Sequence, residues 1–176
     1  MKKHIEIAVL LVTLVTLLLS ALPALASARP ALNPYEQQLV KCINQERAQH
    51  GLSALRINDA LVTSARAHSA DMGQRKYFDH NMPGGQTWQA RVIRSGYAPR
   101  GYKIWKAGED IYWGAGLKSS PVSAADAWMH SASHRAVILA KGFRDIGIGA
   151  VQAIDGGGQA SCPVWFFTMD AGCRVK

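Results

Sequence analysis

The sequence predicts an α+β domain in which helices pack on a small, mainly antiparallel sheet. Segments with helical periodicity come first in the chain, whereas residues 146–154 and 164–169 are strand-like near its end. Glycines at 156–158 separate these two strand-like runs, which is typical of a hairpin loop. Helices followed by clustered antiparallel strands are the pattern of helices that cover a sheet.

Residues 1–28 have the form of a secretory signal peptide. A short basic start precedes an apolar run from Ile7 to Leu19, and small residues follow Pro23. An uncleaved membrane anchor is the alternative, but a spanning helix needs about 20 apolar residues. We therefore expect cleavage near Ala28, export to the periplasm or the extracellular space, and no stable membrane anchor afterwards.

The remainder of the chain suits a single domain, which we place at residues 33–173. The formal net charge of +8 favours contact with anionic surfaces such as polyanionic wall polymers or phospholipid headgroups. Nucleic acid is not an expected partner, because lysines and arginines are scattered along the sequence and the leader directs the chain away from it. A merely soluble surface is the alternative interpretation of the charge.

The first helix has start and stop signals of its own. Asn33 is an N-cap, Pro34 occupies the first helical position and Glu36 the third, which together form a capping box. Gly51 supplies the stop.

A second helix begins at Asn58 or Asp59, and its core-facing stripe repeats at intervals of four, three and four residues. A lone histidine on such a stripe is more often a hydrogen-bonded core residue than a ligand, and we interpret His68 in this way. The stripe consists of Leu61, Ala65, His68 and Met72.

The middle of the chain alternates short elements with glycine-rich turns. We predict a short helix over 86–95, a strand over 102–105, and a helix that Ser120 and Pro121 begin. Glu109 follows Gly108 after the short strand. The apolar face of the later helix is predicted to consist of Val122, Ala125, Trp128 and Met129.

Three cysteines in an exported chain permit one disulfide and leave one thiol over. A strand after Cys162 would carry the chain over 20 Å at ~3.3 Å per residue, and the four residues up to Cys173 reach back only about 13 Å. A bridge requires the two Cα atoms to lie within ~7 Å. Cys42 is therefore the expected partner of the C-terminal segment, with Cys173 preferred over Cys162.

An acid and two histidines carry the candidate chemistry, because a carboxylate with imidazoles binds metals or moves protons. We expect Glu109, His80 and His134 to converge. His130 and His134 are four apart on a predicted helix, but Ser131 stands where a zinc protease has its glutamate base. A serine hydrolase is also disfavoured, because the sequence contains no G-x-S-x-G motif.

The order of these segments resembles the bacterial branch of the CAP superfamily, which comprises cysteine-rich secretory proteins, antigen 5 and pathogenesis-related 1 proteins. The resemblance extends from about Tyr35 to Thr168 and depends on the joint order of the motifs. The matching stretches are residues 43–47 (INQER) with Gly51-Leu52, 67–72 (AHSADM), 77–80 (YFDH), Arg91 with Gly96-Tyr97, 108–111 (GEDI), 128–131 (WMHS) with His134-Arg135 and Ile138-Leu139, and 147–149 (GIG) with Trp165.

The resemblance implies a secreted α-β-α sandwich with a central cavity of two histidines and two acids. His80 matches the first histidine and Glu109 the first acid, whereas Ser131 stands where the second acid is expected. His134 occupies the histidine position of the bacterial S-P-G-H-R motif. His80 and His134 are thus the implied ligands of a divalent metal such as zinc.

Two functions follow from the resemblance. The first is a binding module whose polar cavity holds a metal or lies beside a groove for a small amphiphile, such as a lipid or a sterol, or which contacts an anionic cell-envelope polymer. The second is a metal-assisted extracellular hydrolase, a protease or a cell-wall enzyme, with Glu109 as the general base. A purely structural network of Glu109 and the histidines is the third interpretation.

Overall fold

A computed structural model describes residues 31–153 and 163–176, so the predicted leader and the glycines at 156–158 lie outside the described residues. Four strands form one sheet in the order β1-β3-β4-β2. Only the short β1–β3 pair is parallel, and the other two pairs are antiparallel. The predicted α+β class with a mainly antiparallel sheet is therefore confirmed. The strands are β1 (Arg56–Ile57), β2 (Ile104–Ala115), β3 (Asp145–Ala153) and β4 (Val164–Val175).

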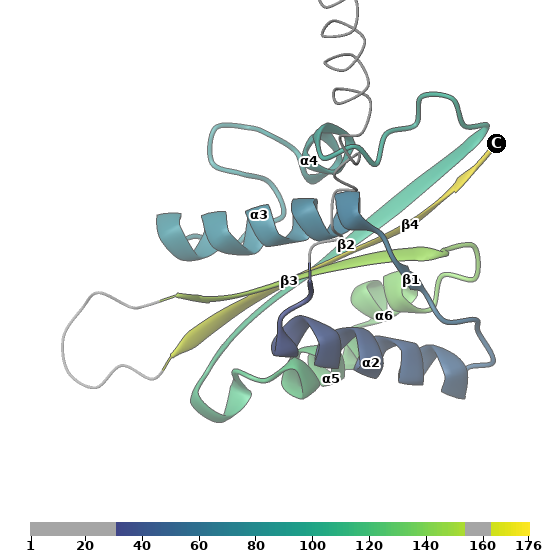
Figure 1. Cartoon of the computed structure of the whole chain (residues 1–176). Coiled ribbons are helices and arrows are strands. Elements are labelled where there is room, and N and C mark those ends of the chain that lie inside the picture. Colours follow the sequence, from purple (N-terminus) through teal and green to yellow (C-terminus); the bar gives the residue numbers. More distant parts are fainter. Residues whose placement is uncertain (1–30, 154–162) are drawn as a thin grey trace, which may run out of the picture.

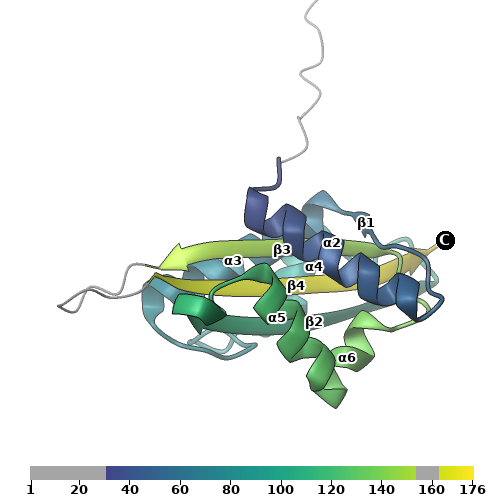
Figure 2. The ribbon, with the colours of Figure 1, turned by 90° about the horizontal axis from the view of Figure 1, so that it is seen from below.

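Helices cover both faces of this sheet, which makes the fold an α-β-α sandwich (Figures 1 and 2). The larger core lies under α2 and α5 and includes Trp128, Ile148 and Phe167, all of which are buried. A smaller cluster lies under α3 and α4. One face carries α2 (Pro34–Gln49), α5 (Pro121–His130) and α6 (Ala132–Ile138); the other carries α3 (Asp59–Arg75) and α4 (Trp88–Arg94).

The two N-terminal helices form as their local signals predict. Asn33 and Glu36 make the reciprocal hydrogen bonds of a capping box at the start of α2, and Gly51 adopts a φ of 68° just beyond its end. Asn58 caps α3. All four residues of the predicted stripe on α3, including His68, are buried, which confirms the interpretation of that histidine as a core residue.

Two glycines on β3 bring α3 unusually close to the sheet. A Cβ at Gly147 would lie 2.1 Å from the backbone of Leu61, and one at Gly149 would lie 2.3 Å from the backbone of Ala65. Any side chain at these positions would push α3 away from the sheet. The glycines therefore determine how closely α3 packs against the sheet.

The middle of the chain differs from the prediction in two places. β2 extends to Ala115, so that Glu109 lies within a long strand and not on a loop. Pairing with β4 along all twelve residues of β2 explains the extension, because it satisfies backbone groups that a loop would expose to water. The second difference concerns α5, where Val122 is 52% exposed although its periodicity predicts a buried position.

His130 and His134 do not share one helix. Ser131 has extended backbone angles (φ −101°, ψ 124°), so that α5 ends at His130 and α6 begins at Ala132. The predicted common face of the two imidazoles is therefore wrong. Both α5 and α6 lie against the edge strand β2.

Cys42 and Cys173 are both free, so the expected disulfide between them is wrong. Cys42 points into the groove between α2 and α5, whereas Cys173 lies within β4 opposite Lys106 of β2. The prediction ended the last strand too early and had the chain turn back before Cys173. Burial raises the pKa of the Cys42 thiol, which makes it less reactive. Cys162 lies outside the described residues.

Candidate functional site

The edge strand β2 delivers two consecutive carboxylates to opposite faces of the sheet, because side chains alternate along a strand. Glu109 points toward α3 and α4, whereas Asp110 lies on the α6 side, as does Gly108, whose position faces Val137. Glu109 is only 6% exposed and Asp110 only 1%. β2 therefore carries two buried acids, one on each face of the sheet.

Glu109 is held by a histidine and an arginine from different elements. His80 Nδ1 lies 2.9 Å from Glu109 Oε1, and Arg91 Nη2 pairs with Oε2 of the same carboxylate. Arg91 also donates from Nη1 to the backbone carbonyl of His80 at 3.3 Å. We call His80, Arg91 and Glu109 the Glu109 cluster. His80 and Glu109 lie in contact in this cluster, and both oxygens of the carboxylate have partners.

His68 is a buried neighbour of this cluster and anchors the loop that carries His80. Its Nε2 lies 3.0 Å from the carbonyl oxygen of Asp79 and 4.0 Å from Glu109 Oε1. Burial lowers the pKa of His68 to about 4, against the opposing effect of the Glu109 charge. The imidazole is therefore neutral at pH 7, and its Nε2–H donates to Asp79.

A second carboxylate faces Glu109 from β4. Asp170 is the register partner of Glu109 in the antiparallel β2–β4 pair, which places both side chains on one face of the sheet. Asp170 is fully buried, and neither of its oxygens makes a hydrogen bond of ordinary geometry with the described residues, although Ser64 and Glu109 are its polar neighbours. Burial first, and then the charge of Glu109, raise its pKa well above the usual range. Burial and the nearby charge of Glu109 therefore favour the neutral form of the Asp170 carboxyl.

Asp110 has a similar environment on the opposite face. Both of its oxygens are buried without a hydrogen-bond partner in the described part of the chain. Burial, followed by the charge of Glu109, raises the pKa of Asp110 to about 8. The Asp110 carboxyl is therefore largely neutral at pH 7.

The other two predicted site residues lie apart from these contacts. His134 has a buried Nδ1 without a hydrogen-bond partner among the described residues, and its pKa is lowered by burial and then by the charge of His80. Ser131 Oγ lies 3.2 Å from Ser133 Oγ at the exposed break between α5 and α6. No hydrogen bond or ion pair within the described residues joins either side chain to Glu109.

The Glu109 cluster fits a divalent metal poorly. Arg91 places a positive charge beside Glu109 and close to His80, which disfavours a second cation there, and His80, whose Nδ1 faces Glu109, has only Nε2 left as a ligand atom. Across residues 31–153 and 163–176, no three His, Cys, Asp or Glu side chains are arranged to hold a metal. Zinc sites in proteins use three or four such ligands.

Sequence reasoning missed two members of this site. Arg91 stood out only as part of a motif, and its pairing with Glu109 depends on where α4 lies. Asp170 did carry a signal, because an acid directly follows the strand-like run that ends at Met169. It was interpreted as the end of the strand, whereas β4 continues through it.

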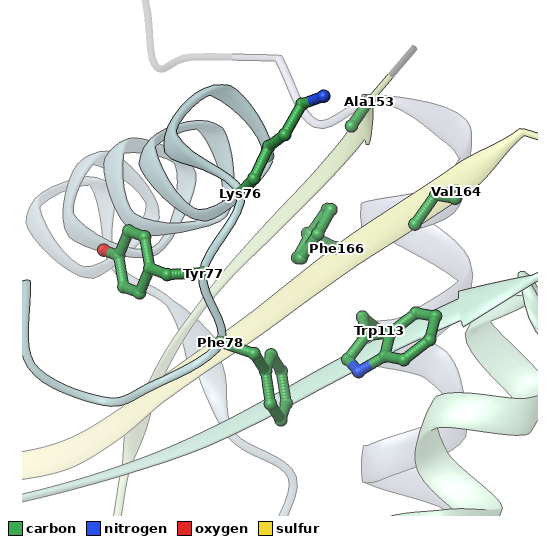
Figure 3. Close-up of a pocket in the computed structure, with 8 residues that line it drawn as sticks. Lys76, Tyr77, Phe78, Trp113, Ala153, Val164 and Phe166 are labelled. Atoms are coloured by element: carbon green, nitrogen blue, oxygen red, sulfur yellow. The ribbon is translucent and has the colours of Figure 1, made fainter. Parts of the chain in front are cut away.

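An apolar pocket adjoins the loop of His80 at the far end of the sheet. It has a volume of about 360 Å³ and lies between the end of α3 and strands β2, β3 and β4. Phe78, Trp113 and Phe166 line it with aromatic rings, and Ala153 and Val164 line it beside Phe166 (Figure 3). Phe78 is 46% and Trp113 51% exposed, which is unusual for side chains of this size.

The buried His68 predicts a pH dependence of stability. Its folded pKa of about 4 lies below the ordinary 6.5, so the stability that it contributes is present above pH 6.5 and is lost as the pH falls toward 4. We expect this loss to reach up to about 3 kcal/mol. Urea unfolding of the wild type and His68→Gln between pH 4 and 7 measures it. Parallel pH profiles for both proteins would contradict the assignment.

Comparison with known proteins identifies relatives over most of this structure. The profile of the Cysteine-rich secretory protein family, CAP, matches residues 40–170. The uncharacterized protein YkwD of Bacillus subtilis (strain 168) is 37% identical over 127 residues, which cover 72% of this chain and 46% of YkwD. The uncharacterized membrane protein YlbC of the same organism is 27% identical over 114 residues, 65% of this chain and 31% of YlbC. The chain thus spans less than half the length of these relatives.

Solved structures of similar fold come from other bacteria. An extracellular protein of Bacillus anthracis str. Ames that contains an SCP domain aligns with a TM-score of 0.61 and 26% identity, over 84% of this chain and 45% of that chain. An outer surface protein of Borrelia burgdorferi has the same TM-score of 0.61 at 20% identity, over 78% of this chain and 91% of that chain. Both are extracellular or surface proteins by name. Among the described residues of the present chain, no helix combines the length and apolarity needed to cross a membrane.

Proposed function

The chain belongs to the cysteine-rich secretory protein (CAP) family, and we propose that it is an exported binding module whose apolar pocket takes one small amphiphile. The observation that carries the proposal is the pocket itself, whose three aromatic side chains lie beside the loop of the Glu109 cluster. Its volume falls in the range of about 300–1,000 Å³ that is typical of small-molecule sites.

The loop from Tyr77 to His80 links the pocket to the polar cluster. Phe78 lines the pocket, and His80, two residues further on, contacts Glu109. Consecutive Cα atoms are about 3.8 Å apart, so these two residues are within about 8 Å of each other at the backbone. The His80 side chain is 41% exposed and is therefore available to the polar end of a ligand whose apolar part lies against Phe78.

The hydrolase alternative has less support from the geometry. A general base needs a free oxygen within reach of the proton that it abstracts, whereas both oxygens of Glu109 already face Arg91 and His80. The poor fit of the cluster to a metal also weakens the metal-assisted version of this chemistry. Binding requires neither a free base nor a metal.

We expect Trp113→Ala to weaken binding of dansyl-labelled undecanoic acid by about tenfold or more, which corresponds to about 1.4 kcal/mol. The Trp113 ring supplies one wall of the pocket and is half exposed, so its removal takes away apolar contact area without opening the core. Dansyl fluorescence during titration of the protein gives the affinity.

Leu117→Ala is the matched control, because this side chain is fully exposed and does not line the pocket. It should leave the affinity unchanged. Equal affinities for the wild type and Trp113→Ala would remove the pocket as the binding site. Absence of binding by the wild type would contradict the proposed ligand class.

A further inference from the structure

The basic residues that are scattered along the sequence gather at one end of the folded sheet. The starts of β1, β2 and β3 and the ends of β4 and α4 meet there, together with the α4–β2 and α6–β3 connections and the C-terminus (Figures 1 and 2). Nine of the seventeen lysines and arginines in the described residues lie on these segments. We call them the basic end: Arg56, Arg94, Arg100, Lys103, Lys106, Lys141, Arg144, Arg174 and Lys176.

The charge of the basic end is not neutralised within the fold. Eight of its nine members are exposed, and none forms an ion pair with an acid in the described part of the chain. Asp59 and Asp145 are the acids on the adjoining segments, and Asp145 accepts a hydrogen bond from the Tyr97 hydroxyl at 2.8 Å. Arg174 stacks at 4.3 Å from the ring centroid of Tyr97, which holds its guanidinium in place.

The same end exposes three aliphatic side chains. Ile93 is 40%, Ile104 46% and Val175 48% exposed, and Ile104 and Val175 are register partners at the tip of the β2–β4 pair. This tip extends beyond the start of β3, since Gly172 is the β4 partner of Asp145 and three β4 residues follow it. Exposed apolar side chains therefore lie at the same end of the sheet as the positive charges.

We propose that the basic end is a docking surface for an anionic phospholipid bilayer. Lysines and arginines near such a surface each strengthen binding several-fold, and exposed aliphatic side chains gain further by entering the boundary between headgroups and acyl chains. A soluble polyanion would reward the positive charges but not Ile104 and Val175. The amphiphile pocket lies at the opposite ends of β2, β3 and β4, so the docked protein would hold it away from the bilayer.

Sedimentation with vesicles tests this orientation and does not depend on the function of the pocket. We expect the protein to bind phosphatidylcholine vesicles that contain phosphatidylglycerol, and pure phosphatidylcholine vesicles at least about tenfold more weakly. Charge reversal at the tip, Lys103→Glu with Lys106→Glu and Lys176→Glu, should reduce binding to the anionic vesicles by about a hundredfold. All variants keep the same N-terminal segment, so its contribution to binding is common to all of them.

The matched control reverses three exposed basic residues outside the basic end, Lys41, Lys118 and Arg135, to glutamate and gives the same net charge. An equal loss in this control would show a general charge effect and overturn the proposal. Ile104→Ser with Val175→Ser should weaken vesicle binding several-fold and leave binding to soluble polyphosphate unchanged. Full vesicle binding by this variant would assign the surface to a polyanion and also overturn the proposal. Thermal unfolding confirms that each variant is folded.

Discussion

Replacing Arg91 with methionine is expected to destabilise the protein by about 3–5 kcal/mol, the typical cost of removing one partner from a buried ion pair. Arg91 is 5% and Glu109 6% exposed, so water cannot take the place of the guanidinium. The substitution also removes the hydrogen bond to the carbonyl of His80, which leaves the His80 loop less firmly held. Urea unfolding at pH 7 measures the loss.

Two companion variants separate the ion pair from the packing of α4. Arg94→Met changes an exposed arginine on the same helix and should alter stability by less than about 0.5 kcal/mol. Arg91→Met combined with Glu109→Gln removes both charges and should recover a large part of the lost stability. A double variant no more stable than Arg91→Met would show that packing, and not the uncompensated carboxylate, causes the effect.

The helices before the site could be predicted because their signals are local. The capping box at Asn33 and the stripe on α3 act within one helix, and tertiary contacts reinforce them. β2 could not be predicted to its full length, because its sequence IWKAGEDIYWGA contains glycines and consecutive acids that disfavour a strand. Pairing with β4, which is distant in the sequence, overrides these preferences.

The candidate site divides in the same way into residues that sequence motifs indicate and residues that only the tertiary fold brings into place. His80 and Glu109 were identified through a family resemblance that extends over the whole domain, whereas the Arg91 contact depends on the placement of α4. The basic end could not be predicted from the local sequence either. Arg56 and Lys176 are far apart in the sequence and come to one end of the sheet only through strand register. A search for basic stripes along single helices could not have detected it.

Asp110→Asn is expected to stabilise the protein at pH 8 and not at pH 5. In the unfolded chain this carboxyl ionises near its ordinary pKa of 3.8, whereas in the folded protein burial keeps it protonated up to about pH 8. Folding therefore takes up a proton between these two values, and stability falls as the pH rises through this window. The accumulated cost at pH 8 is up to about 5 kcal/mol, since each pKa unit corresponds to about 1.4 kcal/mol.

Asparagine removes this cost because it does not ionise, although its buried amide still lacks a hydrogen-bond partner at a cost of about 1–3 kcal/mol. The net gain should therefore be about 2–4 kcal/mol at pH 8, and should be absent or reversed at pH 5. Urea unfolding of the wild type and the variant at both pH values measures it, and the titration of His68 is common to both proteins. Asp126→Asn is the control, since this side chain is 70% exposed and should show no such change with pH. An equal effect of Asp110→Asn at pH 5 and pH 8 would mean that Asp110 ionises in the folded protein much as it does in the unfolded chain.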